Sequence, residues 1–560
     1  MALQRGETLH DDVPANRWCI TWRDFGKLRN DLAIAVAVGE ISPTEKDDFD
    51  PDDRRDGPNM YSVNEQFIKP RTRAAGGMSY ALMLYPEGLP CDLFISHAWQ
   101  EGAFELIDKL QASWPRGNDH AWCCVLANPQ NLNINHMLRT PHESPFAVAL
   151  RSATHMLVVS NKGGSVYSRI WCVYEIYIAY NADKTILMAR APIDRDMKRQ
   201  MPSMLIVGVV AFAINRAIFA THTTEWFLSA EAKSVFNFIV LVATGMVIFW
   251  NSRWWRFWNH VGIVAIILPT GGPYHPFMLA MSHKLGCQHT MNIFWLEYAY
   301  RSCIIFFFIV SELDRLRDCA LKVSERQLRR GYTGSVTDAV CTDENDKERI
   351  FGYLGDQIEE VDKAVNDLIA TGMSTESLRR ASELDVRTAH VARFHHAPMA
   401  FLICFAVIRY LLSAYCETIY IWIRAGFLVG AITWVGVYLS LPLDGKAFAC
   451  AASSKLFAVG ELLNMFATLF GYTNEDAVGY TSAILSIIFA ALAVVVSTAR
   501  IHRVARVPII GRTLAVLLIG RGLKELLFAC DASEVKSART FYGRLDSTSE
   551  SGYDSSDSAL

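Results

Sequence analysis

Eight apolar segments in the later part of the chain constrain its fold most. They are residues 204–220, 235–250, 261–281, 293–310, 397–416, 419–441, 455–471 and 480–498. A helix that crosses a bilayer needs roughly 20 mainly apolar residues, and several of these segments are close to that minimum. The sequence therefore predicts an all-α, multi-pass transmembrane region built from two groups of four spans, 204–310 and 397–498.

The charges beside these segments predict how the protein lies in the membrane. "ARAPIDRDMKRQ" before the first segment and "ARIHRVAR" after the eighth are basic, whereas "THTTEWFLSAEAKS" and "YTNEDAVG" are not. Basic loops favour the cytoplasmic side of a membrane. We therefore expect an integral membrane protein with both termini in the cytoplasm. Its expected partner is the lipid bilayer, and no nucleic-acid partner is expected; the net charge of −3 says little about partners.

Four further segments differ in character from the apolar spans. Residues 1–57 are expected to be a leader and an acidic linker, and residues 311–396 a charged, helical cytosolic insert. Residues 507–529 combine basic residues with leucines, which is typical of an amphipathic helix lying on the membrane surface. Residues 531–560 are rich in serine and aspartate, and they are expected to be a disordered tail.

Residues 58–195 are expected to form an α/β domain. Four short apolar segments are typical of strands, namely 91–97, 121–127, 155–160 and 185–189. Segments with helical spacing lie between them, at 101–114, 144–153 and 168–182. This alternation predicts a parallel sheet covered by helices on both faces. Cys123 and Cys124 are adjacent in the second expected strand, so their side chains are expected on opposite faces.

A single glutamate in an apolar helix marks the candidate site. Glu175 lies within "SRIWCVYEIY", and a buried carboxylate must be paired, protonated or used in chemistry. In α/β sheets, ligands bind outside the carboxyl ends of the strands. Trp171 precedes Glu175 by four residues and shares its helix face. The polar and aromatic residues that follow the first three strands are Ser96, His97, Trp99, Asn128, Gln130 and Ser160. Together these side chains predict a crevice for a nucleotide.

Other chemistry is less consistent with the sequence. Ser96 and His97 are neighbours on a strand and point to opposite faces, and no G-x-S-x-G elbow is present. The histidines and the 13 cysteines lack the spacing of metal ligands, so neither a metal nor a resident cofactor is expected. A purely structural role for Glu175, in an ion pair with Arg169 or Arg151, remains an alternative.

Three stretches resemble one known family. "CDLFISH", "SPFAVALRSATHMLVVS" and "SRIWCVYEIYIAYNADKTILMA" resemble the Toll/interleukin-1 receptor (TIR) domain, over roughly residues 88–195. That flavodoxin-like α/β fold opens with a D-x-F-I-S strand and carries W-C-x-x-E, which Trp171, Cys172 and Glu175 match. The longer stretch from "PNMYSVNEQFIKP" to "CDLFISHAW" also resembles uncharacterised multi-pass membrane proteins of unicellular eukaryotes.

The resemblance implies a signalling protein. In TIR domains that cleave NAD⁺ to nicotinamide and ADP-ribose, this glutamate is catalytic, so it implies a catalytic Glu175, with NAD⁺ as a substrate rather than a cofactor. One alternative is a TIR-type assembly module without activity that self-associates through the domain. Another alternative is a transporter or channel that its cytosolic domain regulates.

Overall fold

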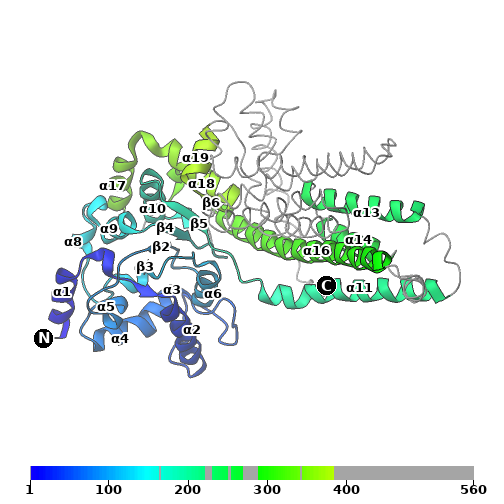
Figure 1. Cartoon of the computed structure of the whole chain (residues 1–560). Helices are drawn as coiled ribbons and strands as arrows, with labels where there is room; N and C mark the ends of the chain where they lie inside the picture. Colours follow the sequence, from blue (N-terminus) through cyan, green and yellow to red (C-terminus); the bar gives the residue numbers. More distant parts are fainter. Residues whose placement is uncertain are drawn as a thin grey trace.

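The chain forms a sheet domain and an arm of long helices that extends from it (Figure 1). The computed structural model describes residues 2–162, 166–220, 230–249, 254–268, 288–340 and 344–383. The expectations for residues 397–498, 507–529 and 531–560 lie outside these ranges.

Six strands form one mixed sheet in the order β1-β3-β2-β4-β5-β6. Their bounds are β1 (Ile20–Thr21), β2 (Leu93–Ser96), β3 (His120–Cys123), β4 (His155–Val158), β5 (Thr185–Met188) and β6 (Met373–Ser374). β3, β2, β4 and β5 are parallel and confirm the four predicted strands. β1 and β6 pair antiparallel at the two edges, so the sheet is mixed and not purely parallel. Both edge strands come from segments that the sequence did not assign to this domain.

Short helices and turns connect the strands. They are α1 (Ala2–Asp12), η1 (Ala15–Arg17), α2 (Trp22–Ala37), α3 (Met60–Val63), η2 (Asn64–Ile68), α4 (Lys69–Ala74), α5 (Tyr80–Leu84), α6 (Ala103–Ser113), α7 (Cys124–Ala127), α8 (Asn135–Leu138), η3 (Pro141–Glu143), α9 (Pro145–Ser152), η4 (Val166–Ser168) and α10 (Ile170–Asn181). The helices after β5 are α11 (Asp194–Ala220), α13 (Ala230–Phe249), α14 (Trp255–Ile267), α16 (Gln288–Arg329), η5 (Val336–Asp338), α17 (Glu344–Leu354), η6 (Gly355–Gln357), α18 (Ile358–Thr371) and α19 (Glu376–Glu383).

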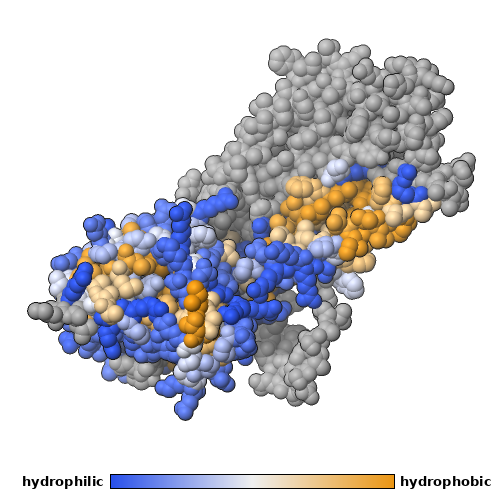
Figure 2. Space-filling view, turned by 90° about the horizontal axis from the view of Figure 1, so that it is seen from below, coloured by the Kyte–Doolittle hydropathy of each residue, from blue (hydrophilic) through white to orange (hydrophobic). Residues whose placement is uncertain are grey.

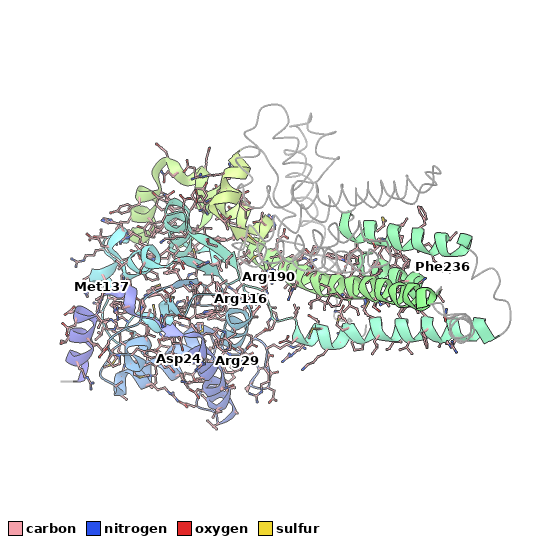
Figure 3. The ribbon with its side chains drawn as sticks, viewed as in Figure 1. Asp24, Arg29, Arg116, Met137, Arg190 and Phe236 are labelled. Atoms are coloured by element: carbon pink, nitrogen blue, oxygen red, sulfur yellow. The ribbon has the colours of Figure 1, made fainter. Side chains whose placement is uncertain are left out.

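The segment expected to be a leader is part of the sheet domain. Thr21 and Asp24 form a capping box at the start of α2, each side chain accepting a hydrogen bond from the other's backbone N–H. The apolar face of α2 is buried, and the Arg29 guanidinium lies 3.7 Å from the centre of the Phe104 ring on α6. Asp24 and Arg29 are labelled on this helix in Figure 3. The domain therefore extends well before residue 58.

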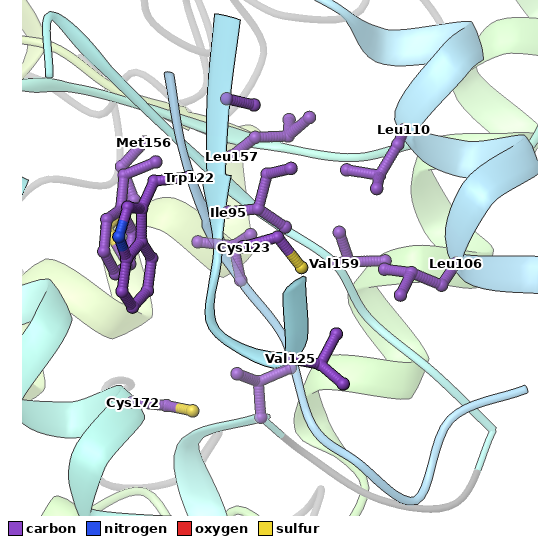
Figure 4. Packing of buried hydrophobic residues seen from close by; sticks show 14 of the residues in the cluster. Ile95, Leu106, Leu110, Trp122, Cys123, Val125, Met156, Leu157, Val159 and Cys172 are labelled. Atoms are coloured by element: carbon purple, nitrogen blue, oxygen red, sulfur yellow. The ribbon is translucent and has the colours of Figure 1, made fainter. Parts of the chain in front are cut away.

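The core of the domain lies on both faces of the central strands. All four residues of β2 are buried, as expected for a strand that helices cover on both sides. On one face Trp122 stacks on Phe94, with ring centres 5.0 Å apart. Ile95 lies toward Leu106 and Leu110 of α6, on the other side of the strands from Trp122 (Figure 4).

The helical arm consists of α11, α13, α14 and the first part of α16, and it contains four of the predicted apolar segments in whole or part. α14 and α16 pack closely because Gly262 has no side chain: a Cβ there would lie 2.0 Å from Phe308. Apolar side chains such as Leu205, Ile206 and Val209 of α11 are exposed, and Figure 2 shows apolar surface gathered on the arm. Among the described residues, one helix, Asp194–Ala217, is long and apolar enough to cross a membrane.

α16 joins the arm to the sheet domain. Its 42 residues span about 63 Å at 1.5 Å per residue. Near its end, the Ser324 hydroxyl donates a hydrogen bond to the Ala189 carbonyl oxygen at 3.0 Å, directly after β5. The chain then returns through α18 to β6, which pairs with β5. The insert 311–396 is therefore helical, as predicted, where it is described, and it also completes one edge of the sheet.

Candidate functional site

The candidate site lies at the carboxyl ends of β2 and β4, where the strand order of the sheet reverses. β2 has β3 on one side and β4 on the other, so the connections that leave the carboxyl ends of β2 and β4 diverge at this point. Ser96 is the last residue of β2, and Ser160 follows β4 by two residues. The helix that carries Glu175, α10, follows β4 in the chain.

Glu175 and Ser96 form the centre of the site. Glu175 is only 4% exposed, and the Ser96 hydroxyl donates a hydrogen bond to Glu175 Oε2 at 2.5 Å. Burial raises the pKa of Glu175 to about 7, although the Ser96 hydrogen bond and the charges of His97 and Arg169 act in the opposite direction. A carboxyl group with such a pKa exchanges its proton near neutral pH, as a reactive group requires.

His97 faces a different set of groups. Its Nδ1 lies 2.6 Å from Glu101 Oε1, and its Nε2 lies 3.1 Å from Cys124 Sγ and 3.5 Å from Cys123 Sγ. Ser96 and His97 thus contact separate partners, and no hydrogen bond between their side chains is present among the described residues.

The prediction that Cys123 and Cys124 point to opposite faces is wrong. The expected strand 121–127 ends at Cys123, and α7 begins at Cys124. Because the backbone turns from extended to helical between them, both thiols reach the same imidazole nitrogen. Trp99 also joins this group, since its indole N–H donates to Cys124 Sγ at 3.2 Å.

Sequence reasoning missed Glu101, Cys123 and Cys124 as members of a site. Two signals were present: "HAWQE" sets Glu101 four residues after His97, and the cysteine pair follows a strand that adjoins β2. Neither signal shows that the thiols and the imidazole meet, because that contact depends on the turn at Cys124.

Ser160 holds α16 against the sheet domain. Its carbonyl oxygen accepts a hydrogen bond from Lys109 Nζ at 2.6 Å, and its hydroxyl donates to Gln327 Oε1 at 3.0 Å. Lys109 is almost fully buried and also pairs with Glu105 at 2.8 Å. The polar groups around Ser160 therefore already contact the last part of α16.

Of the three remaining predicted residues, Gln130 and Trp171 lie in structural contacts, whereas the buried side-chain oxygen of Asn128 has no hydrogen-bond partner among the described residues. Gln130 donates hydrogen bonds to the carbonyl oxygens of Val125 and Asn128, which closes the loop after α7. The indole N–H of Trp171 donates to Asp346 of α17 at 3.2 Å. The structure thus brings Ser96 to Glu175, and it brings Trp99 to His97 through Cys124. The hydrogen bonds of Gln130 and Trp171 go to other residues.

Other groups near Glu175 do not neutralise it by direct pairing. Arg169 acts on it through its charge, and no salt bridge links Glu175 to Arg169 or Arg151 in the part of the chain with described coordinates. No cluster of three or more metal-ligating side chains occurs among those same residues. A separate open hollow of about 310 Å³ is lined by other residues, namely His10, Ala15, Trp18, His136, Met137, Thr140, Glu143 and Pro145.

No protein-family model, curated protein or solved structure matches this chain.

Proposed function

We propose that this chain is a membrane-embedded signalling protein whose TIR-like domain cleaves NAD⁺ to nicotinamide and ADP-ribose. The observation that carries this proposal is the Glu175 carboxyl group, which is buried, has a pKa of about 7 and is bonded to Ser96 at the end of a central strand. Buried groups with a shifted pKa are common at functional sites, and the carboxyl ends of parallel strands are where ligands bind in α/β sheets.

The chemistry follows from the charge of the substrate. The nicotinamide ring of NAD⁺ is cationic and leaves as a neutral molecule with the bonding electrons, so its departure needs no general acid. The ribosyl centre left behind is oxocarbenium-like, and the ionised Glu175 carboxylate stabilises that positive charge. Water then adds to the ribosyl carbon and releases a proton, which gives ADP-ribose. The Ser96 hydroxyl holds the carboxylate in position through its hydrogen bond.

The strand order supports a flavodoxin-like, TIR-like domain. In chain order, the four parallel strands lie second, first, third and fourth across the sheet. This is the start of the flavodoxin-like order 2-1-3-4-5, in which ligands bind at the point between the first and third strands. Glu175 and Ser96 lie at that point.

The helical arm supports a bilayer as partner. The span Asp194–Ala217 has 24 residues, and its part after the charged first turns, residues 200–217, is about 27 Å long at 1.5 Å per residue, close to a hydrocarbon core of roughly 30 Å. Its exposed leucine, isoleucine and valine side chains fit contact with lipid chains. The two groups of four spans and the cytoplasmic termini belong to this proposal, on the basis of the sequence.

A second candidate is an assembly module without activity. Glu175 is only 4% exposed, and α16 and α17 contact Ser160 and Trp171 beside it. This closure favours a domain whose surface, rather than its crevice, carries the signal. The transporter alternative has less support. A charged residue within an apolar segment often marks a transport path, but the buried Arg301 guanidinium donates a hydrogen bond to the Ile266 carbonyl oxygen at 2.8 Å and so contributes to helix packing.

The test measures nicotinamide release from NAD⁺ by the full-length protein in lipid nanodiscs, dilute and clustered. Wild type is expected to release nicotinamide, and Glu175→Gln is expected to reduce the rate by roughly 100-fold or more, since it removes the transition-state charge partner. Glu143→Gln, at an exposed position, is the matched control. No release from folded, clustered protein, or equal release by Glu175→Gln, would reject the enzyme proposal and leave the assembly module.

A further inference from the structure

The group around His97 has the geometry of an activated thiol. Cys124 Sγ lies 3.1 Å from His97 Nε2 and accepts a hydrogen bond from the Trp99 indole N–H at 3.2 Å. His97 Nδ1 lies 2.6 Å from Glu101 Oε1, and both residues are buried, at 3% and 1% exposure. A nucleophile, a base beside it and a third group that orients the base are the parts of nucleophilic catalysis.

Electrostatics in this cluster favours the protonated imidazole of His97. Burial lowers the pKa of His97, but the charges and hydrogen bonds of Cys124 and Cys123 outweigh it and raise this pKa well above its ordinary value. Burial raises the pKa of Glu101, and the hydrogen bond from His97 acts in the opposite direction. The other titratable groups that act on the imidazole come from α10 and are Cys172 and Glu175. A thiol beside His⁺ loses its proton more readily.

The two thiols differ in access. Cys124 is partly exposed, whereas Cys123 is buried at 1% exposure, near Val125 and Val159 (Figure 4). Burial raises the pKa of Cys123. Because the Cys124 sulfur is partly covered, only a small reagent can reach it. The second thiol, Cys123, lies 3.5 Å from the same imidazole nitrogen.

We propose that Cys124 is a nucleophilic thiol for a hydroperoxide, with Cys123 as the resolving thiol. His97 takes the Cys124 proton as the sulfur attacks, and it then acts as the proton donor. The sulfur of Cys124 attacks the terminal peroxide oxygen and the O–O bond breaks. The leaving alkoxide takes the proton of the His97 imidazolium and departs as an alcohol, or as water from hydrogen peroxide. Sulfur loses two electrons and becomes a sulfenic acid, while the peroxide is reduced.

The second step uses the neighbouring thiol. His97, neutral after the first step, takes the Cys123 proton as the Cys123 sulfur attacks the sulfenic sulfur. An S–S bond forms, the leaving hydroxide takes that proton and departs as water, and no further oxidant is needed. Adjacent Cα atoms are about 3.8 Å apart, below the usual 4.4–6.8 Å of disulfides, so this bond is strained and a dithiol reductant reverses it readily. A nucleophile for acyl groups does not need a second thiol, which is why a peroxide fits this pair better.

The experiment compares two cysteines in one molecule. Cys319 is exposed and lies on α16, where its sulfur accepts a hydrogen bond from Arg315 Nη1 at 3.6 Å. It has no histidine contact among the described residues, so it serves as an internal control. At pH about 6.5 an ordinary thiol is roughly 1% ionised, so removal of the thiol proton by the neighbouring His97 is expected to give Cys124 an advantage on the order of 10-fold. In full-length protein in nanodiscs, we expect hydrogen peroxide to oxidise Cys124 about 10-fold faster than Cys319, as read by mass spectrometry of peptides.

Two variants test the parts of the mechanism. Glu101→Gln is expected to slow Cys124 several-fold and to leave Cys319 unchanged. Cys123→Ser is expected to replace the disulfide with a Cys124 sulfenic acid, which dimedone traps. Cys124 oxidising no faster than Cys319 in wild type would overturn the proposal without any variant, and so would a Glu101→Gln rate equal to the wild-type rate.

Discussion

Replacement of Glu175 with glutamine is expected to change how the stability of the protein depends on pH. The pKa of Glu175 is about 7 in the folded chain, against an ordinary value of 4.5. Between these values the folded state holds a proton that the unfolded state has lost. The stability that protonated Glu175 contributes is therefore complete below about pH 4.5, and it decreases as the pH rises through about 7.

The size of the effect follows from the shift. A difference of about 2.5 pKa units at 1.36 kcal/mol per unit corresponds to about 3 kcal/mol. Glutamine has nearly the same shape, carries no proton to lose and can still accept a hydrogen bond from Ser96. The free energy of unfolding of Glu175→Gln, relative to wild type, is therefore expected to increase by about 3 kcal/mol between about pH 4.5 and pH 8.

The assay is urea unfolding of the full-length protein in detergent micelles, followed by tryptophan fluorescence at several pH values. Glu143→Gln is the control, because that side chain is largely exposed in the folded protein. A Glu175→Gln difference that stays constant within about 1 kcal/mol across this range would show that the carboxyl group is not buried in its protonated form. The reasoning about Glu175, and the catalytic proposal with it, would then lose its basis.

Three other substitutions test the packing around the site. Lys109→Met removes the buried cation between Glu105 and Ser160 and should lower the free energy of unfolding by about 3 kcal/mol in the same urea assay. Gly372→Ala should cost about 1–2 kcal/mol, because the residue has φ 74° and a Cβ would lie 2.5 Å from Leu321; Gly352→Ala, with nothing within 4 Å, is the control. Thr21→Ala should lower the melting temperature by breaking the capping box, at about 1 kcal/mol, and Thr21→Ser should restore it.

The central strands and helices could be predicted from the sequence because each carries a strong local pattern. "CDLFISH" and "HMLVVS" are continuous apolar segments, as expected for strands covered on both faces. The two edge strands could not be predicted, since β1 and β6 have two residues each and too little length for any periodicity. Their positions depend on pairing with β3 and β5, far away in the sequence.

The candidate site was predictable to the same limited degree. Glu175 stands out in the sequence because a charge is unusual within an apolar helix, and its partner Ser96 follows from the rule about strand ends. The contact of Cys124 with His97 was not predictable, because "AWCCVLA" is apolar throughout and does not show where the strand ends. The turn from β3 to α7 brings Cys124 to His97, and packing around the loop sets that turn.

The adjacency of Ser96 and His97 explains how one strand end can carry two separate chemistries. Alternation along β2 sends Ser96 to Glu175 and the next residue, His97, to Glu101 and Cys124. The Cys172 thiol donates to the His97 carbonyl oxygen. Helix α10 therefore contacts Ser96 through Glu175 and His97 through Cys172. Neither proposed reaction uses the other's reactive group. Because the charge of His97 acts on Glu175 although no hydrogen bond joins Glu175 to Cys124, Glu175→Gln is expected to change the oxidation rate of Cys124 by less than about tenfold, and Cys124→Ser is expected to change nicotinamide release by no more than that.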